Sequence, residues 1–157
     1  DPTMIPGLLE PIVAGHADAV FGSRMIVKAN ALSGGMPYWK FLANIVLTKI
    51  ENAILGLRLT EYHSGFRAYS RRVLERVPFE ENSNDFVFDT EIIVQIKLAG
   101  LRILEIPIMT RYFPGASMIG LKRSIVYGCS IIGVMARYVL FCAKIKKYPQ
   151  FVVKPYA

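Results

Sequence analysis

The sequence predicts one compact α/β domain in which helices are layered on a small sheet. Short apolar runs of strand length alternate with longer segments in which apolar residues recur at helical spacing. The chain has 157 residues, of which 53% are hydrophobic and 20% charged. This composition is enough to bury a core, and it excludes intrinsic disorder.

Gly and Pro residues mark where the expected elements end. Gly15, Gly56 and Gly100 each follow a run with helical periodicity and are expected to stop a helix. Helices are therefore expected over residues 3–15, 38–55, 71–76 and 89–99. β-branched and apolar runs predict strands over residues 18–24, 64–69 and 101–109. The Ala-, Ser- and Gly-rich stretch 25–37 and the polar stretch 80–85 are expected to be loops.

The C-terminal segment, residues 119–157, differs from the rest and is expected to be a separate unit after a domain over residues 1–118. No charged residue occurs at positions 124–136, and Arg137 then interrupts the apolar run. The uncharged stretch is shorter than the roughly 20 residues that a membrane span needs. Basic residues flank it on both sides, which favours an amphipathic helix at the membrane interface. A tilted span that tolerates Arg137 and an ordinary core helix are the alternatives.

The basic residues of the chain are distributed unevenly. Nineteen Lys and Arg residues against twelve Asp and Glu residues give a net charge of +7, and the last acid is Glu105. Every charged side chain after it is basic, which predicts an anionic partner such as a membrane surface or a phosphorylated substrate. A solvated basic tail is the alternative. Nucleic acid is not expected as a partner, because the basic residues form no recognisable binding motif with exposed aromatic residues.

Two segments in the middle of the chain carry candidate site residues. In residues 62–74, Ser64 can hydrogen bond, Gly65 permits close backbone approach, and Arg67 offers a planar fork suited to phosphate or carboxylate. A structural ion pair is the alternative role for Arg67. In residues 85–91, Asp89 is a candidate general base or hydroxyl-positioning carboxylate, and a helix N-cap is its alternative role.

A third candidate segment, residues 110–117, follows the last expected strand. Arg111 and Tyr112 would project from the strand end into a loop that contains Pro and Gly, a common place for ligand contacts. The sequence offers no metal-binding pattern, since Cys129 and Cys142 lack ligand spacing and His63 has no partner His or Cys nearby. No metal ligands are therefore expected within these residues.

Five segments in a fixed order resemble the C-terminal part of family 2 glycosyltransferases. They are residues 22–24 (GSR), 34–44 (GGMPYWKFLAN), 59–71 (LTEYHSGFRAYSR), 84–92 (NDFVFDTEI) and 105–117 (EIPIMTRYFPGAS). In pattern they are similar to dolichyl-phosphate mannosyltransferases and bacterial polyprenyl-phosphate glycosyltransferases, and the resemblance runs from residue 1 to about residue 140. It implies part of a GT-A, Rossmann-like domain whose nucleotide-binding half would precede Asp1.

The resemblance also implies roles for individual residues. Arg24, Lys40, Asn44 and Arg111 match positions that hold the acceptor phosphate, although Lys40 stands where the family often has arginine. The residues expected to line the site are Ser64, Gly65, Arg67, Tyr112 and Ser117. The loop reads TRYFPGAS, whereas the mannosyltransferases have R-x-x-G-x-S-K.

The implied reaction is inverting transfer of a sugar from a nucleotide-sugar donor to a polyprenyl phosphate of the dolichyl type. A divalent metal, Mg²⁺ or Mn²⁺, would neutralise the leaving diphosphate, with ligands upstream of Asp1. The fragment alone is therefore expected to be inactive. A phosphate acceptor is already ionised and needs no strong base, whereas a hydroxyl acceptor would need one, for which Asp89 is the candidate. The expected location is the cytoplasmic face of a membrane, and a non-enzymatic basic membrane-surface module is the other alternative.

Overall fold

The computed structural model describes residues 1–110 and 120–155 and shows a mixed α/β fold. The sheet has three strands in the order β2-β1-β3, where β1 is Ala19–Ser23, β2 is Arg67–Tyr69 and β3 is Ile103–Pro107. The central strand β1 pairs antiparallel with β2 and parallel with β3. The predicted α/β class is confirmed, and the arrangement is consistent with part of a Rossmann-like domain.

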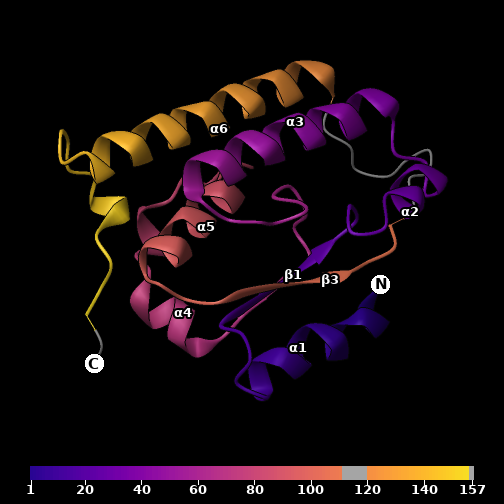
Figure 1. Cartoon of the computed structure of the whole chain (residues 1–157), viewed down its shortest axis with the longest axis horizontal. Coiled ribbons are helices and arrows are strands. Elements are labelled where there is room, and N and C mark those ends of the chain that lie inside the picture. The colour runs from indigo at the N-terminus through magenta and orange to yellow at the C-terminus, as the bar shows by residue number, and fades with distance from the viewer. Residues whose placement is uncertain (111–119, 156–157) are drawn as a thin grey trace.

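Helices cover both faces of the sheet (Figure 1). Helix α1 (Ile5–Val13) lies on one face, and α5 (Phe88–Leu98) lies on the other, beneath an outer layer of α3 (Tyr38–Leu55) and α6 (Leu121–Cys142). Successive residues of β1 point to opposite faces, so Val20 packs with α1 whereas Ala19 and Phe21 join the main core. Because both faces are covered, all five β1 residues are buried.

The helix boundaries follow the sequence signals closely at several places. Helix α3 begins directly after Pro37 and ends at Gly56, whose φ of 65° is the left-handed conformation that favours glycine. Helix α4 (Arg71–Arg76) has Ser70 as its N-cap, and the Ser70 side chain accepts a hydrogen bond from the backbone N–H of Val73. The helix expected over residues 3–15 is a 3₁₀ turn, Pro2–Met4, followed by α1.

The prediction of an unbroken loop over residues 25–37 is wrong, because α2 (Lys28–Ser33) lies within it. The sequence KANALS contains good helix formers, and Ala31 is buried with Met25 and Met36 in a small cluster. Close packing explains Gly34 at the end of this helix. A Cβ atom there would lie 2.2 Å from the carbonyl oxygen of Thr110. The stretch 80–85 likewise begins inside a 3₁₀ turn, Phe79–Glu81.

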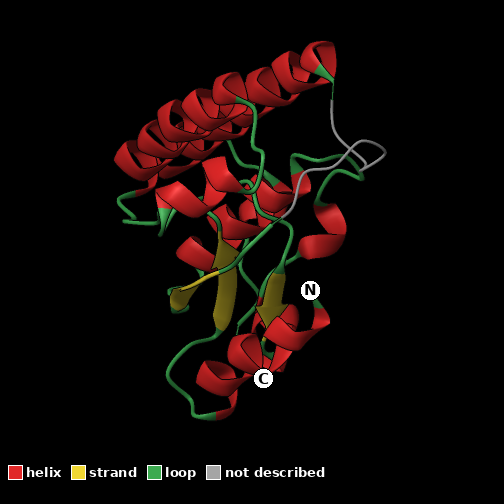
Figure 2. Cartoon of the chain, turned by 90° about the vertical axis from the view of Figure 1, so that its right-hand side faces the viewer, coloured by secondary structure: helices red, strands yellow, loops and turns green. Residues whose placement is uncertain are grey.

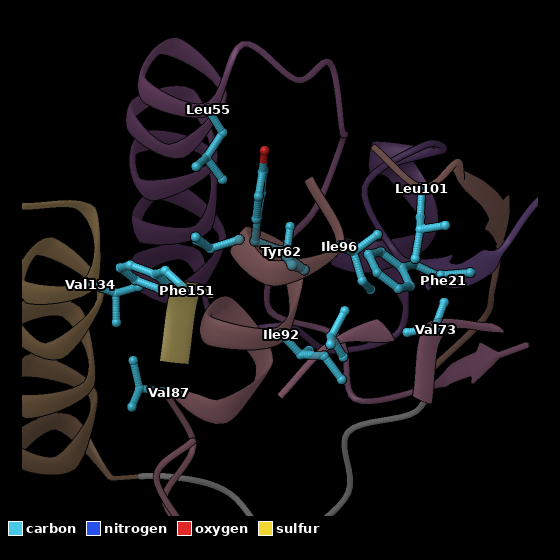
Figure 3. Close-up of a cluster of buried hydrophobic side chains, with 14 of the residues drawn as sticks. Phe21, Leu55, Tyr62, Val73, Val87, Ile92, Ile96, Leu101, Val134 and Phe151 are labelled. Atoms are coloured by element: carbon cyan, nitrogen blue, oxygen red, sulfur yellow. The ribbon is translucent and has the colours of Figure 1, made fainter. Parts of the chain in front are cut away.

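The main core lies between the sheet and the outer helices (Figure 3). Phe21 of β1, Ile92 and Ile96 of α5, and Val134 of α6 all contribute fully or almost fully buried side chains. Phe151 of the 3₁₀ turn Pro149–Phe151 folds back into the same core. Burying each such side chain contributes about 1.5–3 kcal/mol, so the core depends on residues from both ends of the chain.

Helix α6 is amphipathic and lies in the outer layer of the fold (Figure 2), and one of its faces, from Tyr127 to Phe141, packs against the main core. By length and composition it could cross a membrane. However, Ile131, Val134 and Met135 are buried in the main core, while Ile125 and Val139 are exposed. One face of the helix therefore belongs to the core, as the core-helix alternative predicts, and the opposite face is apolar and exposed. The expected division at residue 118 stays a prediction.

A buried carboxylate also ties α6 to α5. The Nη2 atom of Arg137 donates to Oε1 of Glu91 at 3.0 Å, and its Nη1 atom donates to Gln150 at 2.8 Å. The other Glu91 oxygen, Oε2, accepts from the backbone N–H of Ser83 at 2.8 Å. The Glu91 side chain is 2% exposed, so Arg137 is the cation that balances a charge inside the domain.

Replacing Arg137 by Ala should lower the free energy of unfolding by about 2–3 kcal/mol, because it leaves the Glu91 carboxylate buried without its cation. This is less than the about 3–5 kcal/mol typical of a fully buried pair, because the Arg137 side chain is itself 36% exposed. Urea unfolding measures the loss. Lys122→Ala, an exposed cation of the same helix, should change stability by no more than about 0.5 kcal/mol. If Arg137→Ala and Lys122→Ala lowered the free energy of unfolding equally, Arg137 would not be the cation that stabilises the buried Glu91 carboxylate.

Candidate functional site

The C-terminal end of β1 carries an arginine that is held by a buried glutamate. The backbone N–H of Arg24 donates to Oε2 of Glu61 at 2.7 Å, and its Nε donates to Oε1 at 2.8 Å. A further contact joins Nη2 of Arg24 to the same oxygen. Asn44 of α3 donates to that oxygen at 2.8 Å through its Nδ2. Glu61 therefore brings together the end of β1, the side of α3 and the segment before β2.

A second carboxylate fixes the segment that carries Glu61. The oxygens of Glu105, on β3, accept hydrogen bonds from the backbone N–H of Thr60 at 2.7 Å, the Thr60 hydroxyl at 2.8 Å and the Glu61 N–H at 3.1 Å. Burial raises the pKa of Glu105, and the neighbouring Glu61 charge raises it further, while the hydrogen bonds oppose this. The two glutamates are thus held by short, oriented contacts rather than by solvent.

Lys40, in the first turn of α3, lies close enough to Arg24 for the two cations to interact. Burial lowers the pKa of Lys40, and the positive charge of Arg24 lowers it further. Two cations and the Asn44 amide therefore converge on one region, and the Arg24 side chain keeps 17% of its surface exposed. Arg24, which Glu61 holds in one orientation, can bind an anion such as a phosphate without first rearranging.

Arg67 forms the structural ion pair that was the alternative to a ligand-binding role; its partner is Asp89. Its guanidinium donates to the carbonyls of Ser64 at 2.6 Å and Asp89 at 2.9 Å, and it lies 4.6 Å from the centre of the Phe21 ring. The side chain is 3% exposed. This group holds the segment before β2 against the start of α5. Its placement in the site lining stays a prediction.

Asp89 does not cap α5. The N-cap residue is Val87, and no side chain caps it. The Asp89 carboxylate lies in the first turn, 3.4 Å from the Arg67 guanidinium, and is 30% exposed. Burial raises the pKa of Asp89, and the Arg67 charge opposes this shift. A partly exposed carboxyl with a raised pKa can exchange protons, so the geometry permits the candidate base.

Beneath this region lies a buried polar network that the sequence analysis did not identify. Thr90 donates to Oε1 of Glu51 at 3.1 Å, Oε2 of Glu51 lies 3.4 Å from Nε2 of His63, and Nδ1 of His63 lies 3.2 Å from the Tyr127 hydroxyl. The network joins α5, α3, the segment before β2 and α6. The carbonyl of His63 also accepts from Nη2 of Arg24 at 3.2 Å, so the network reaches the arginine at the end of β1.

One proton satisfies the centre of this network. Oε2 of Glu51 and Nε2 of His63 are both buried, and the described residues give them no other hydrogen-bond partner. Burial raises the pKa of Glu51 to about 8 and lowers that of His63 to about 3. At neutral pH the carboxyl is therefore mostly protonated and can donate to the neutral imidazole. The pair is held without a net charge inside the domain.

The structure brings some of the predicted site residues together and leaves others elsewhere. Arg24, Lys40 and Asn44 converge as described above. Ser64 is buried, and its hydroxyl accepts from the backbone N–H of Phe66 at 3.4 Å. A Cβ atom at Gly65 would meet no described atom within 4 Å, so packing does not require glycine there. The remaining predicted residues, Arg111, Tyr112 and Ser117, lie outside the described residues.

The carboxylates that organise the site, Glu61 and Glu105, were not among the residues predicted for it. Glu61 stands inside the segment 59–71 that carries the family resemblance, but nothing local shows that it pairs with Arg24, 37 positions away. Glu105 gave a usable signal, because a lone carboxylate in an otherwise apolar strand must find partners if it is buried. Over residues 1–110 and 120–155, no three His, Cys, Asp or Glu side chains are grouped to hold a metal. The described residues therefore do not fit the divalent ion that the resemblance implies.

Comparison with known proteins identifies glycosyltransferases among the relatives of this chain. It is 33% identical to a low-salt glycan biosynthesis hexosyltransferase of Haloferax volcanii over 66% of this chain and 24% of that protein. It is 28% identical to the dolichyl-phosphate hexose transferase of the same organism over 80% of this chain and 54% of that protein. A UDP-N-acetylglucosamine–dolichyl-phosphate N-acetylglucosaminyltransferase of Methanococcus voltae is 29% identical over 71% of this chain and 43% of that protein.

The predicted resemblance to glycosyltransferases is therefore confirmed, at modest identity and over part of the chain. The chain spans between about a quarter and a half of the length of these relatives. No protein-family model matches the chain. No solved structure matches it either.

The Glu51–His63 pair predicts how stability depends on pH. Glu51 gains a proton on folding between its ordinary pKa of 4.5 and about 8, so its contribution to stability falls as pH rises through that window. His63 loses a proton on folding between about 3 and its ordinary value of 6.5, so its contribution rises with pH there. Above about pH 6.5 only the Glu51 contribution of this pair still changes.

Glu51→Gln should therefore flatten the fall in stability between about pH 6.5 and 8, because the amide keeps the donor and acceptor but does not titrate. Chemical unfolding at both pH values measures the difference from wild type. Glu10→Gln, at an exposed position of α1, serves as the control and should leave the pH profile unchanged. An unchanged slope in Glu51→Gln would show that the folded chain holds Glu51 ionised.

Proposed function

We propose that this chain forms the acceptor-binding part of a glycosyltransferase that transfers a sugar to a polyprenyl phosphate. The cluster of Arg24 and Asn44 on the buried Glu61, with Lys40 near Arg24, carries this proposal. The names of two relatives state dolichyl phosphate as the acceptor, which supports the same chemistry here.

The cluster suits an acceptor that is itself a phosphate. Glu61 orients the guanidinium of Arg24 through several contacts, so little conformational freedom remains to be lost when an anion binds. The phosphate oxygen is already ionised at neutral pH, so it can attack the anomeric carbon of the sugar without a strong base. The cations then position the nucleophile. Attack opposite the leaving nucleoside diphosphate would invert the anomeric configuration, as in the family 2 enzymes that the sequence resembles.

The donor is assigned to another part of the enzyme. Because the described residues group no metal ligands, we place the nucleotide-sugar and its Mg²⁺ or Mn²⁺ ion in the part of the relatives that this chain does not cover. When bound, the ion would neutralise charge on the leaving diphosphate. The residues described here contribute the binding and orientation of the acceptor.

Helix α6 supports attachment to a membrane. Its outer face exposes Leu121, Ile125, Val126 and Val139, while Lys122 and Arg123 stand at its first turn. An apolar face flanked by lysine and arginine is typical of helices that lie in the interface of a bilayer. We place this face on the cytoplasmic side of the membrane, with the acceptor phosphate at the headgroup level.

Asp89 supports a second candidate function, transfer to a hydroxyl. Such a reaction needs a base, and the partly exposed carboxyl of Asp89, whose pKa is raised by burial, could serve as one. In that case Arg67 would be a positioning residue, because its guanidinium pairs with Asp89. The experiments below separate the two reactions.

Lys40→Gln should lower kcat/KM for the polyprenyl phosphate about 10-fold, because it removes a charge-assisted contact of roughly 1.5 kcal/mol. Lys40 is more informative than Arg24, since losing Arg24 also leaves Glu61 buried without its cation. The assay uses an active enzyme that contains this chain, with membranes or detergent-dispersed acceptor. Lys49→Gln, an exposed position on the same helix, is the matched control and should keep full activity. Equal activity of the two variants would contradict the proposed acceptor site.

Asp89→Asn should leave transfer nearly unchanged if the acceptor is a phosphate. The variant removes the base but keeps the shape of the side chain, and its melting temperature shows whether the fold is intact. If Asp89→Asn abolishes transfer at unchanged stability while Lys40→Gln stays active, the base-assisted reaction replaces the proposed one.

The chain should bind anionic vesicles in a salt-sensitive manner, because each basic residue near the surface contributes on the order of 1 kcal/mol at low ionic strength. Vesicle flotation at low and high salt, with neutral vesicles alongside, measures this dependence. Identical binding to neutral and anionic vesicles would show that the basic residues make no contribution.

A further inference from the structure

A cleft of about 190 Å³ lies between residues 85–87 and the first half of α6. Phe86, Val126 and Tyr127 form its apolar wall, and Lys122 and Arg123 line the same cleft with positive charge. The Phe86 and Tyr127 rings meet edge to face with centroids 6.5 Å apart, and the Arg123 guanidinium lies 5.8 Å from the centre of the Phe86 ring. None of these residues takes part in the contacts described for the acceptor cluster. Tyr127 contacts His63 of the buried network beneath that cluster.

Two large apolar side chains of the cleft, Phe86 and Val126, are exposed to solvent. Phe86 is 48% exposed and Val126 60% exposed. Asp85 is the acidic residue of the lining, and its carboxylate accepts a hydrogen bond from the backbone N–H of Phe86 at 2.7 Å. Two cations beside an apolar wall suit a ligand that carries a phosphate at one end and a hydrocarbon chain at the other.

We propose that this cleft binds an anionic phospholipid of the bilayer, with the phosphate at Lys122 and Arg123 and the start of an acyl chain on Phe86 and Val126. The exposed apolar residues of α6 continue beyond the cleft, so a lipid held there would lie in the surface layer of the same membrane. The site is separate from the acceptor cluster, where Arg24 and Lys40 supply the positive charge.

The cleft and the acceptor cluster are nevertheless connected. The Tyr127 hydroxyl in the cleft lies 3.2 Å from Nδ1 of His63, and the carbonyl of His63 accepts from Arg24 at 3.2 Å. Occupation of the cleft would hold Tyr127 and the first half of α6 against this network. A phospholipid would then support the geometry of Arg24 without taking part in the reaction.

The test titrates dihexanoyl phosphatidylglycerol, below its micelle concentration, into the full chain. Dihexanoyl phosphatidylcholine, a zwitterion of no net charge, is the comparison. Replacing both Lys122 and Arg123 by Gln should weaken phosphatidylglycerol binding at least about 10-fold, the size expected for losing charge-assisted contacts. The matched control replaces Lys144 and Lys147 by Gln, which removes the same charge from exposed positions in the segment that follows the end of α6. This control should change binding less than 3-fold.

Two results would overturn the proposal. Equal weakening by the two double variants would mean that only the net charge of the surface matters. Equal affinity for the two lipids would mean that the cleft does not distinguish a net anionic headgroup from a zwitterionic one. Phe86→Ala, which keeps every charge, should also weaken binding, and its melting temperature confirms folding. Lys40→Gln should leave phosphatidylglycerol binding unchanged, so failure of the acceptor site and failure of this cleft are distinguishable.

Discussion

The contact between Arg24 and Glu61 organises the region to which the function is assigned. A buried carboxylate needs a cation and oriented donors, and Glu61 obtains them from the end of β1 and from α3, while Glu105 accepts from the backbone N–H of Glu61 and fixes its segment. Each of these elements comes from a different part of the chain. The charge requirement of one side chain therefore sets how the strand end, the helix and the loop stand relative to one another, and with them the position of the Arg24 guanidinium.

The same principle recurs where α6 meets the domain. Glu91 is buried between α5 and α6 and is neutralised by Arg137, whereas Glu51 is buried nearby and is held protonated against His63. The first carboxylate is paired with an arginine, whereas burial raises the pKa of the second and lowers the pKa of the imidazole beside it. Glu91 thus binds α6 through Arg137, and the Glu51–His63 pair binds it through Tyr127, one helix position in each half of α6.

Local signals in the sequence predicted the elements well but the contacts between them poorly. Pro37 and Gly56 define α3 to the residue, since each imposes a backbone conformation on its own position. Helix α2 was missed because its six residues are too few to show a periodic pattern, and its burial against Met25 and Met36 stabilises it. The family resemblance placed Arg24, Lys40 and Asn44 at one site. Glu61, which holds Arg24, could not be identified, because ion pairing across dozens of residues leaves no local pattern.

Because Ile131, Val134 and Met135 belong to the main core, the inner face of α6 is part of the folded domain. Its outer face exposes apolar side chains. The element is not detachable. Cutting the chain before α6 to obtain a water-soluble form would expose the main core to solvent. It would also leave the buried Glu91 carboxylate without Arg137. Solubility would instead have to be engineered on the outer face, by polar substitutions at positions such as Ile125, Ile132 and Val139. The inner face of the helix would be left untouched.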